Sequence, residues 1–286
     1  IARRARELAD ALAFMLAASD PAYVYFLEMR GRTVTLRAAP IDVSGIVREL
    51  VLDSRHGAVL TSATLSVDGR FDYVRARLGI AEADEVRLPS EFDYARQALL
   101  YLPPRMPRPR DPGYADAVAV EVRRLLTCSR GRAFVLFTSY AAMTHVVRQL
   151  ESDLPFPMLV QGSAPRSALL DAFRHTPQAV LFATASFWQG VDVQGEALSC
   201  VIVDKLPFAS PGDPVTAARI DALTAAGEEA FSTYQVPLAI LTLQQGLGRL
   251  IRHRSDRGVL AVLDPRLRTM GYGRRFLDSL PPAPVT

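Results

Sequence analysis

The length of 286 residues leaves room for about two domains of ~150 residues, each with a substantial core. A hydrophobic content of 49% with 22% charged residues excludes a disordered chain, and the net charge of +3 permits nucleic-acid binding without arguing for it. Cys128 and Cys200 form no C-x-x-C pair and give no metal-ligand spacing, which favours a reducing cytoplasm.

The first 52 residues predict a helix, a β-hairpin and a second helix. Residues 1–20 keep a helical stripe of apolar side chains. No segment approaches the ~20 apolar residues that a membrane span requires, so we expect no membrane partner. Residues 23–28 and 33–37 flank a turn at Gly31 and predict two paired strands. Residues 41–52 predict the next helix.

Beyond residue 56 the chain alternates short apolar runs with amphipathic segments. Each run has apolar residues bounded by polar or turn residues, as expected for strands that are buried on both faces of a parallel sheet. The runs are GAVLTS, AFVLFTS, PMLVQGS, AVLFATAS, CVIVDKLPF and GVLAVLD. Residues 141–150 and 167–173 predict helices between them, and the proline-rich residues 102–113 predict a linker or surface loop. This alternation predicts a doubly wound α/β fold.

Small polar residues gather directly after these runs. The carboxyl ends of parallel strands meet at one edge of a sheet, where hydroxyls and amides are natural contacts for a phosphate-bearing ligand. Each residue alone is better explained as a helix cap, so the signal lies in their number at one edge. The group comprises Thr61, Ser62, Thr138, Ser139, Gln161, Gly162, Ser163, Thr184, Ser186, Asp204 and Asp264.

Residues 241–254, LTLQQGLGRLIRHR, predict a helix with an anion-binding face. At ~100° per residue, one face carries Gln245, Gly248, Arg249 and Arg252, and leucines on the opposite face can pack on a core. Arginine can hold an anion bidentately, and the missing side chain of Gly248 lets the anion approach, so this face suits a phosphate. A solvated basic face is the alternative that these residues leave open.

Five motifs of the sequence, in this order, resemble the later motifs of DinG-type DNA helicases, which are relatives of XPD. Each motif alone would be a weak signal, and the ordered series is a strong one. The motifs are VLTSATL (59–65), VLFTSY (135–140), SFWQGVDVQG (186–195), DKLPFASPGDP (204–214) and QQGLGRLIR (244–252). The tail at 263–282 also resembles the end of the family, whereas Gln189 stands where many relatives have glutamate.

The resemblance implies a motor of two RecA-like domains, with ATP in the cleft between them and single-stranded DNA across the top. Residues 1–20 would end an arch-type insertion, 21–90 would close the first motor domain, and 91–286 would form the second, RecA-like domain. Ser62 and Thr64, in the last strand of the first domain, would couple the nucleotide state to DNA. We expect a monomer in the cytoplasm that moves 5′ to 3′ on single-stranded DNA, with a role in repair or in clearing replication obstacles.

The resemblance also assigns roles to individual residues. Core packing explains Phe187 equally well, whereas a helix cap is the lesser alternative for Asp192. Residues implied at the DNA are Thr138, Ser139, Tyr140, Gln161, Ser163, Thr184, Ser186, Phe187 and Trp188. Residues implied at the nucleotide are Gly190, Asp192 and Gly248, with Gln245, Arg249 and Arg252 as sensor and finger residues at the γ-phosphate. This interpretation requires Arg249 and Arg252 to face the edge where the polar residues collect.

The implied cofactors are ATP and Mg²⁺, whose other ligands would lie upstream of this chain. No G-x-x-x-x-G-K-[ST] motif and no acidic magnesium box occur in the sequence, so we expect the chain alone to hydrolyse no ATP. An iron–sulfur cluster, which family members often carry on four cysteines, would belong to the first domain and not to this chain.

Two other functions compete with the motor. A catalytically silent module that binds nucleic acid or regulates a partner would keep the hydroxyls at the strand ends and would not need both arginines. A nucleotide-sugar transferase would also bind diphosphates at strand ends, and it gives no reason for the ordered series of motifs. The coding sequence upstream of Ile1 would separate the three, because a Walker A lysine there supports the motor.

Overall fold

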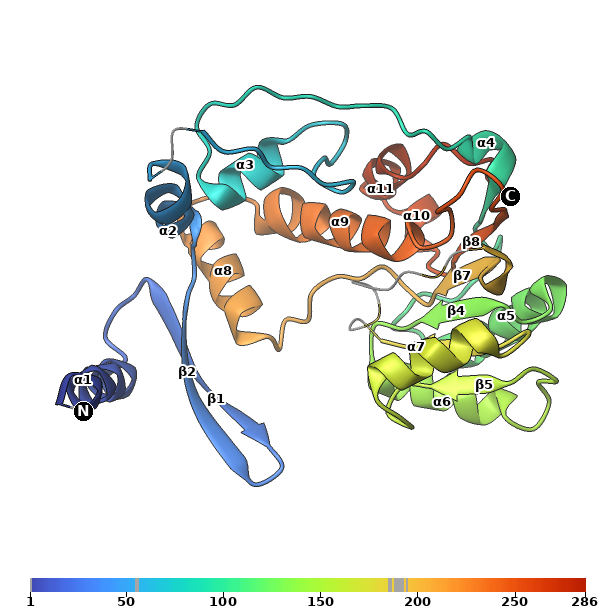
Figure 1. The fold of residues 1–286 in the computed structure, drawn as a ribbon, viewed down its shortest axis with the longest axis horizontal. Coiled ribbons are helices and arrows are strands. Elements are labelled where there is room, and N and C mark those ends of the chain that lie inside the picture. Colours follow the sequence, from blue (N-terminus) through green and yellow to red (C-terminus); the bar gives the residue numbers. More distant parts are fainter. Residues whose placement is uncertain (1, 55–56, 185–186, 188–192, 194) are drawn as a thin grey trace. The chain divides into compact units, whose positions relative to one another are not determined.

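The computed structural model describes residues 2–54, 57–184, 187, 193 and 195–286 of the chain (Figure 1). The chain divides into two compact units. The first comprises Ile1–Leu65, Arg70–Glu85 and Phe208–Leu238, and the second comprises Ser66–Gly69, Val86–Pro207 and Ala239–Thr286. The domain ranges 1–20, 21–90 and 91–286 stay a prediction, because these units group residues by packing and each draws on separate stretches of the chain.

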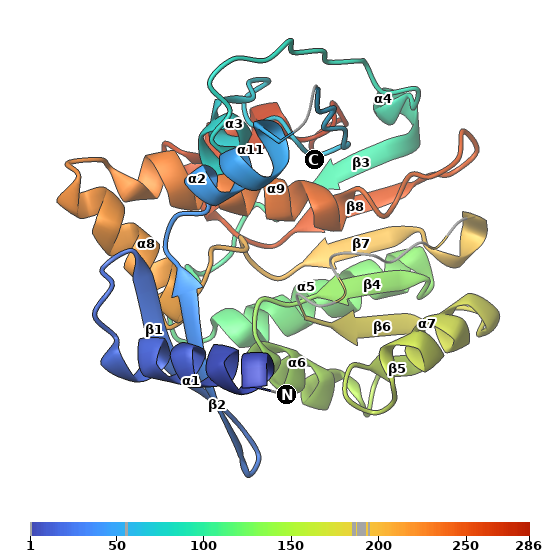
Figure 2. The same cartoon turned by 60° about the vertical axis from the view of Figure 1, so that its left-hand side comes forward.

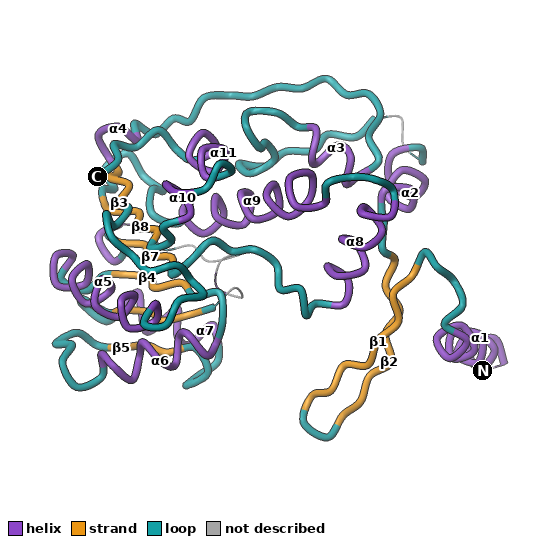
Figure 3. The backbone as a smooth tube through the Cα atoms, turned by 180° about the vertical axis from the view of Figure 1, so that it is seen from behind, coloured by secondary structure: helices purple, strands orange, loops and turns teal. Residues whose placement is uncertain are grey.

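A helix and a β-hairpin open the first unit. Helix α1 spans Ala2–Ala17, and strands β1 (Tyr23–Arg30) and β2 (Thr33–Pro40) pair antiparallel, as the orange strands of Figure 3 show. Gly31 lies in the turn with φ +60°, a conformation that glycine adopts without a Cβ clash. The predicted helix, hairpin and turn are confirmed.

A small helical cluster completes the first unit. Leu223, Ala230 and Tyr234 form its buried core, and Tyr73 and Ile220 pack against them. The helical segments are α2 (Ser44–Val47), a π-helical turn (Arg48–Leu52), α3 (Asp72–Leu78), α8 (Pro214–Ala225), a second π-helical turn (Phe231–Gln235) and the first residues of α9 (Val236–Leu247). The helix predicted over residues 41–52 is confirmed from Ser44 onward.

Among the described residues, the second unit holds a six-stranded sheet in which every strand is parallel to its neighbours (Figure 2). Its strand order is β3-β8-β7-β4-β6-β5. Strands β4, β6 and β7 are buried at every position, which explains why they read as continuous apolar runs. The strands are β3 (Ala98–Tyr101), β4 (Ala133–Leu136), β5 (Met158–Val160), β6 (Val180–Ala183), β7 (Cys200–Val203) and β8 (Gly258–Val262).

Helices cover both faces of this sheet. On one face, sheet residues such as Val135 and Ile202 share a buried core with α5 and α6. On the other face, Phe134 packs against Phe173 of α7, with ring centroids 4.6 Å apart. The helices are α4 (Tyr94–Gln97), α5 (Tyr114–Ser129), α6 (Tyr140–Leu150), α7 (Arg166–His175), α10 (Arg266–Thr269) and α11 (Gly273–Ser279), with a 3₁₀ turn at Gly195–Ala197. The predicted doubly wound α/β fold is confirmed.

One predicted strand is wrong and one observed strand was not predicted. Residues 57–62, the run GAVLTS, form no strand, and Val59 is 94% exposed. A strand needs a neighbour for its backbone groups, and the described part of the chain pairs none with this run. Strand β3 was missed because its short run adjoins the proline-rich loop. Its outer side is covered by the chain's last residues, where the Leu100 amide donates to the Pro284 carbonyl over 2.8 Å.

No helix in the described part of the chain combines the length and apolar character needed to cross a bilayer.

Candidate functional site

The carboxyl ends of the parallel strands bring five of the predicted polar residues to one edge of the sheet. Because all strands of the sheet run in the same direction, residues that follow them must lie at the same edge. In spatial order they are Asp264 after β8, Asp204 after β7, Thr138 after β4, Thr184 after β6 and Gln161 after β5. Hydrogen bonds link several of these residues to the neighbouring strand, in separate groups around Gln161, Asp204 and Asp264.

Gln161 forms hydrogen bonds at one end of this edge. Its Oε1 accepts a hydrogen bond from the Thr184 amide over 2.6 Å and from the Thr184 hydroxyl over 3.0 Å. Its Nε2 donates to the hydroxyl of Tyr140, the first residue of α6. Thr184 is buried, whereas the Tyr140 side chain is 56% exposed, so the network connects the sheet interior to a solvent-facing ring.

Asp204 holds the middle of the edge. Its Oδ1 accepts from the Thr138 amide over 3.0 Å, and its backbone carbonyl accepts from the Tyr114 hydroxyl over 2.6 Å. Burial raises the pKa of Asp204 to about 7, although Lys205 and the Thr138 amide act in the opposite direction. The carboxyl therefore titrates near neutrality, directly beneath one of the residues predicted to face DNA.

Asp264 closes the other end with an ion pair. Its Oδ2 accepts from the Leu206 amide over 2.8 Å and from the Arg266 guanidinium over 2.6 Å. The Asp264 carboxylate raises the pKa of Arg266 against the opposing effect of burial. The bond from the Leu206 amide ties the end of β8 to the segment that follows β7, and the Asp264 carboxylate is fully covered.

Two further predicted residues serve local structure as well. The Ser139 hydroxyl caps α6 by accepting from the Ala142 amide over 3.3 Å, and the Ser163 hydroxyl donates to the Val160 carbonyl over 2.8 Å. A capping role does not exclude ligand contact, because a hydroxyl at a helix N-terminus stands beside free backbone amides.

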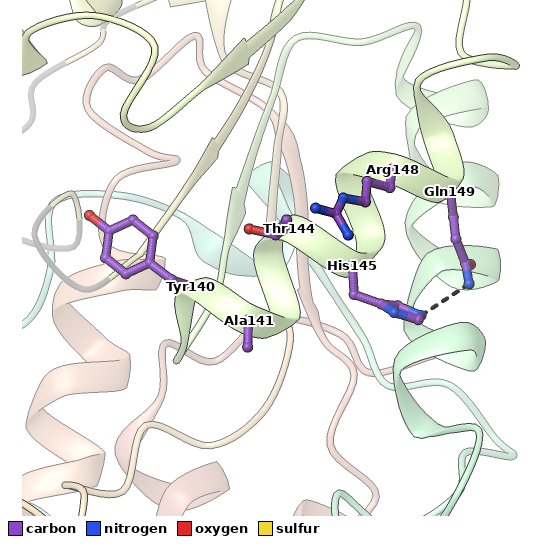
Figure 4. Close-up of a pocket in the computed structure, with 6 residues that line it drawn as sticks. All are labelled: Tyr140, Ala141, Thr144, His145, Arg148 and Gln149. Atoms are coloured by element: carbon purple, nitrogen blue, oxygen red, sulfur yellow. Dashed lines mark hydrogen bonds between the residues drawn. The ribbon is translucent and has the colours of Figure 1, made fainter.

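A surface hollow of about 630 Å³ lies along α6, next to this edge (Figure 4). Tyr140, Thr144 and Arg148, spaced one helical turn apart, line one side of it. His145 turns toward α5, where its Nε2 lies 2.7 Å from Oδ1 of Asp116. Hydrogen bonding to His145 lowers the pKa of Asp116. The hollow thus continues the polar edge with hydroxyl groups and a cation.

Phe187 and its neighbours complete the predicted DNA group. The Phe187 side chain is only 3% exposed, and the guanidinium of Arg166 lies 5.4 Å from its ring centroid. In this conformation the ring packs inside the unit and offers no open stacking surface. Ser186, Trp188, Gly190 and Asp192 lie outside the described residues.

The predicted helix over residues 241–254 is wrong in its second half. Helix α9 ends at Leu247, and the residues from Gly248 to β8 form turns and loop. The amides of Arg252 and His253 donate to Oδ2 of Asp256, each over 2.8 Å, instead of continuing the helical ladder. Gln245 therefore lies on α9, while Arg249 and Arg252 lie on the following loop and do not share a helical face with it.

The structure also places this loop at the opposite end of the strands from the polar edge. The loop leads into the amino end of β8, and the side chain of Leu250 approaches Gly258, the first residue of that strand. A helix between parallel strands runs antiparallel to them, so residues just before a strand belong at its amino end. The loop backbone at Arg252 therefore does not share the edge of the polar residues, so the expectation of one shared edge is not met and the roles of Arg249 and Arg252 stand on the motif alone. The protein has two separate polar clusters.

Two residues of the second cluster were missed in the sequence. Gln97, just before β3, and Asp256, just before β8, are each 7% exposed, and both bond to the backbone of the arginine-bearing loop. No local pattern marks Gln97, which lies far from the loop in the sequence. An aspartate three residues after His253 was a visible turn signal.

Ser62 and Thr64, predicted to couple nucleotide and DNA, bond to each other. The Thr64 amide donates to the Ser62 hydroxyl over 3.2 Å, forming a small turn. Both lie in the first unit.

Comparisons with known proteins agree on one kind of domain. Residues 122–283 match the model of the helicase C-terminal domain family. The chain is 43% identical to the ATP-dependent DNA helicase YoaA of Escherichia coli over 94% of its own length and 42% of that protein. It is 37% identical to the ATP-dependent helicase DinG of Mycobacterium tuberculosis over 96% of its length and 43% of that protein. The chain thus spans less than half the length of these relatives.

A likeness to solved structures supports the fold. An XPD structure superposes with a TM-score of 0.69 at 17% sequence identity, over 96% of this chain and 56% of that one. At this identity the likeness concerns the arrangement of helices and strands alone.

Proposed function

Since this chain belongs to the helicase C-terminal domain family of DinG-like and XPD-like proteins, we propose that it is the second motor domain of a DinG-like ATP-dependent DNA helicase. In this proposal the complete protein couples ATP hydrolysis to movement along single-stranded DNA in the 5′ to 3′ direction. The chain's sequence has no phosphate-gripping G-x-x-x-x-G-K-[ST] motif, so hydrolysis requires a first motor domain. The complete protein acts as a monomer in the cytoplasm.

The polar edge at the carboxyl ends of the strands carries the DNA part of the proposal. Hydroxyls and amides bind the phosphate backbone without reading bases, which a motor that moves over any sequence needs. Tyr140, with its exposed ring, suits a base or ribose, and the buried Thr184 contributes by fixing the Gln161 amide. Thr138, Ser139, Ser163 and Ser186 belong to the same proposed DNA surface, whereas the buried Phe187 ring is left out of it.

The loop after α9 carries the ATP part. Arg249, Arg252 and Gln245 sense and stabilise the γ-phosphate, and a glycine at position 248 leaves room for the approach of the anion. An arginine supplied from a facing domain raises the rate of phosphoryl transfer by ~10³ to 10⁵. Gly190 and Asp192 belong to this proposal through the motif alone.

The described residues do not fit the metals of the complete protein. They contain no group of three or more His, Cys, Asp or Glu side chains that would hold an ion. The sequence has two cysteines, one exposed and one buried, whereas an iron–sulfur cluster takes four. Following the resemblance, we assign magnesium and any cluster to the first domain. The closing segment of that domain, residues 21–90, holds Ser62 and Thr64 as coupling residues. Residues 1–20 end the arch-type insertion, and residues 91–286 form the second domain.

The test is ATP hydrolysis by the complete protein with and without oligo(dT). We expect strong stimulation by DNA in the parent, loss of that stimulation in Arg252→Ala, and affinity for DNA that stays within about threefold. Arg257→Ala is the matched control on the same loop, since Arg257 is exposed and precedes β8 directly. Displacement of streptavidin from the 5′ or the 3′ end of an oligonucleotide reports the direction of movement.

Three outcomes would contradict the proposal or a part of it. A complete protein that binds DNA without hydrolysing ATP is a silent binding module. Hydrolysis that survives Arg252→Ala removes this residue from the phosphate site. Turnover by the purified chain without its first domain would contradict the assignment of the phosphate grip to that domain.

A further inference from the structure

Two buried side chains hold the loop that carries Arg249 and Arg252. From within the loop, the Asp256 carboxylate accepts hydrogen bonds from the amides of Arg252 and His253, each over 2.8 Å. The Asp256 amide in turn donates to the His253 carbonyl over 3.1 Å. The carboxylate therefore fixes the backbone at Arg252 itself.

Gln97 holds the same loop from outside. Its Nε2 donates to the carbonyls of His253, Arg254 and Asp256, at 3.0, 3.2 and 3.0 Å. Its Oε1 accepts from the Asp93 amide over 2.9 Å, so the amide group is anchored at both ends. These partners also fix its orientation, because the nitrogen faces only carbonyls and the oxygen faces an N–H.

The burial of the Gln97 and Asp256 side chains indicates that they serve the geometry of the loop rather than its stability alone. The Asp256 residue is 7% exposed, and burying a carboxyl group away from water is unfavourable unless hydrogen bonds satisfy it, as the two loop amides do here. A continued helix would satisfy the same amides without any buried carboxylate. The loop instead uses side chains to place Arg252 just beyond the end of α9.

We propose that Gln97 and Asp256 are positioning residues for the phosphate-binding arginines, Arg252 above all. This inference rests on the proposed function of Arg252. Gln97 and Asp256 touch no nucleotide and act through the loop backbone. Because an error of ~1 Å in a catalytic group can cost ~10²-fold in rate, loosening either residue lowers turnover more than it weakens ATP binding.

The test compares four variants of the complete protein. Gln97→Glu replaces the donor with an acceptor that faces three carbonyls, and Gln97→Met removes it at similar volume. Asp256→Ala removes both acceptor bonds, and Asp256→Asn keeps a carbonyl oxygen that can accept them. We expect kcat for DNA-stimulated hydrolysis to fall at least ~10-fold in Gln97→Glu and Asp256→Ala, while KM for ATP changes less than ~3-fold. Asp256→Asn recovers most of the rate.

Partial unfolding would also lower kcat, so rates are normalised to DNA-binding-competent protein, titrated with a labelled oligo(dT). The matched controls are Gln178→Glu and Asp278→Ala, whose side chains are exposed and lie away from the loop. Should Gln97→Glu fail to fold, Gln97→Met takes its place. Both controls keep the parent rate.

The outcomes separate this inference from the proposed function. If Arg252→Ala destroys hydrolysis while Gln97→Glu, Gln97→Met and Asp256→Ala leave normalised kcat within twofold, the positioning role is wrong and the motor assignment stands. If Arg252→Ala leaves hydrolysis intact, both fail. A rise in KM equal to the fall in kcat, or an Asp256→Asn variant as slow as Asp256→Ala, would also overturn the inference.

Discussion

At the carboxyl ends of the strands, polar side chains bond to the neighbouring strand, whereas at the amino ends a loop is held by two side chains that bond to its backbone. Gln161 and Thr184 represent the first arrangement, and they stand directly after strands β5 and β6. Gln97 and Asp256 represent the second, and Gln97 lies 156 residues before His253, whose carbonyl it binds. At the first end each residue is placed by the strand that it follows, whereas the second end depends in part on Gln97, which no local pattern connects with the loop.

Because the two ends are built differently, we expect substitutions at each end to impair a different property of the protein. Changes at the carboxyl edge should weaken DNA binding and spare turnover, because in the proposal the single-stranded DNA contacts that edge. Changes at the amino end should lower turnover and spare DNA binding. Substitutions that act on only one end therefore test whether the two ends have separate roles.

Gly258→Ala has the largest expected effect, because Gly258 is the residue at which the amino-end loop joins the sheet. A Cβ at this position would lie 2.2 Å from the Ser199 carbonyl oxygen and 2.8 Å from Cδ1 of Leu250. Strand β8 must then shift against β7, and we expect a loss of about 2 to 4 kcal/mol in the free energy of unfolding, measured by urea denaturation. Gly271→Ala, with open space at its Cβ, should change it by less than about 0.5 kcal/mol. If both variants lost the same free energy of unfolding, crowding at the Gly258 position would not be the cause.

Asp204→Asn tests the buried carboxyl of the other end. Burial raises the pKa of Asp204 to about 7 from its ordinary 3.8, so the folded state binds the proton more tightly than the unfolded state. The free energy of unfolding therefore falls as pH rises through this window and levels off above it. The variant lacks this titration and keeps an acceptor for the Thr138 amide. We expect its melting temperature, relative to the parent, to rise by a few degrees between pH 5 and pH 8.

The control for this titration is Asp278→Asn, an exposed carboxyl paired with Arg274 on α11. Its difference in melting temperature from the parent should be flat with pH. A flat difference for Asp204→Asn as well would mean that the Asp204 carboxyl does not titrate in this range.

The parts of the fold that were predictable are those whose signal is local. Strands β4, β6 and β7 are buried at every position, so burial alone makes them apolar runs, and the parallel direction of the sheet then sets the polar edge. The run at residues 57–62 shows the limit of that signal, because apolar character does not supply a pairing partner.

The second half of the arginine segment shows a different limit. Periodicity predicted a helix through Arg254, and the residues up to Leu247 follow it. Beyond that point a buried carboxylate competes for the amides, and whether Asp256 is buried depends on Gln97 and β3. Periodicity does not carry this information, so the loop and its place at the amino ends could not be derived from the sequence pattern.

Gln161→Leu tests whether the carboxyl edge contributes to DNA binding. The change leaves the buried Thr184 amide without its side-chain acceptor and frees the Tyr140 hydroxyl. We expect the dissociation constant for oligo(dT), measured by fluorescence anisotropy of the complete protein, to rise about 5- to 10-fold, equivalent to about 1 to 1.4 kcal/mol. Turnover at saturating DNA should stay within about twofold, in contrast to Gln97→Glu. Gln178→Leu, an exposed glutamine before β6, should change neither quantity.

Tyr140→Phe has the smallest expected effect and separates the two parts of that side chain. Phenylalanine keeps the exposed ring and loses only the hydroxyl that accepts from Gln161, so we expect oligo(dT) affinity to fall about twofold. Tyr140→Ala also removes the ring, and since stacking on a base contributes ~1 to 3 kcal/mol, its loss should exceed about fivefold. Equal losses would mean that the hydroxyl network rather than the ring contacts DNA at the start of α6. If neither variant loses affinity for oligo(dT), the bound DNA does not contact α6, and the DNA surface is confined to the sheet edge itself.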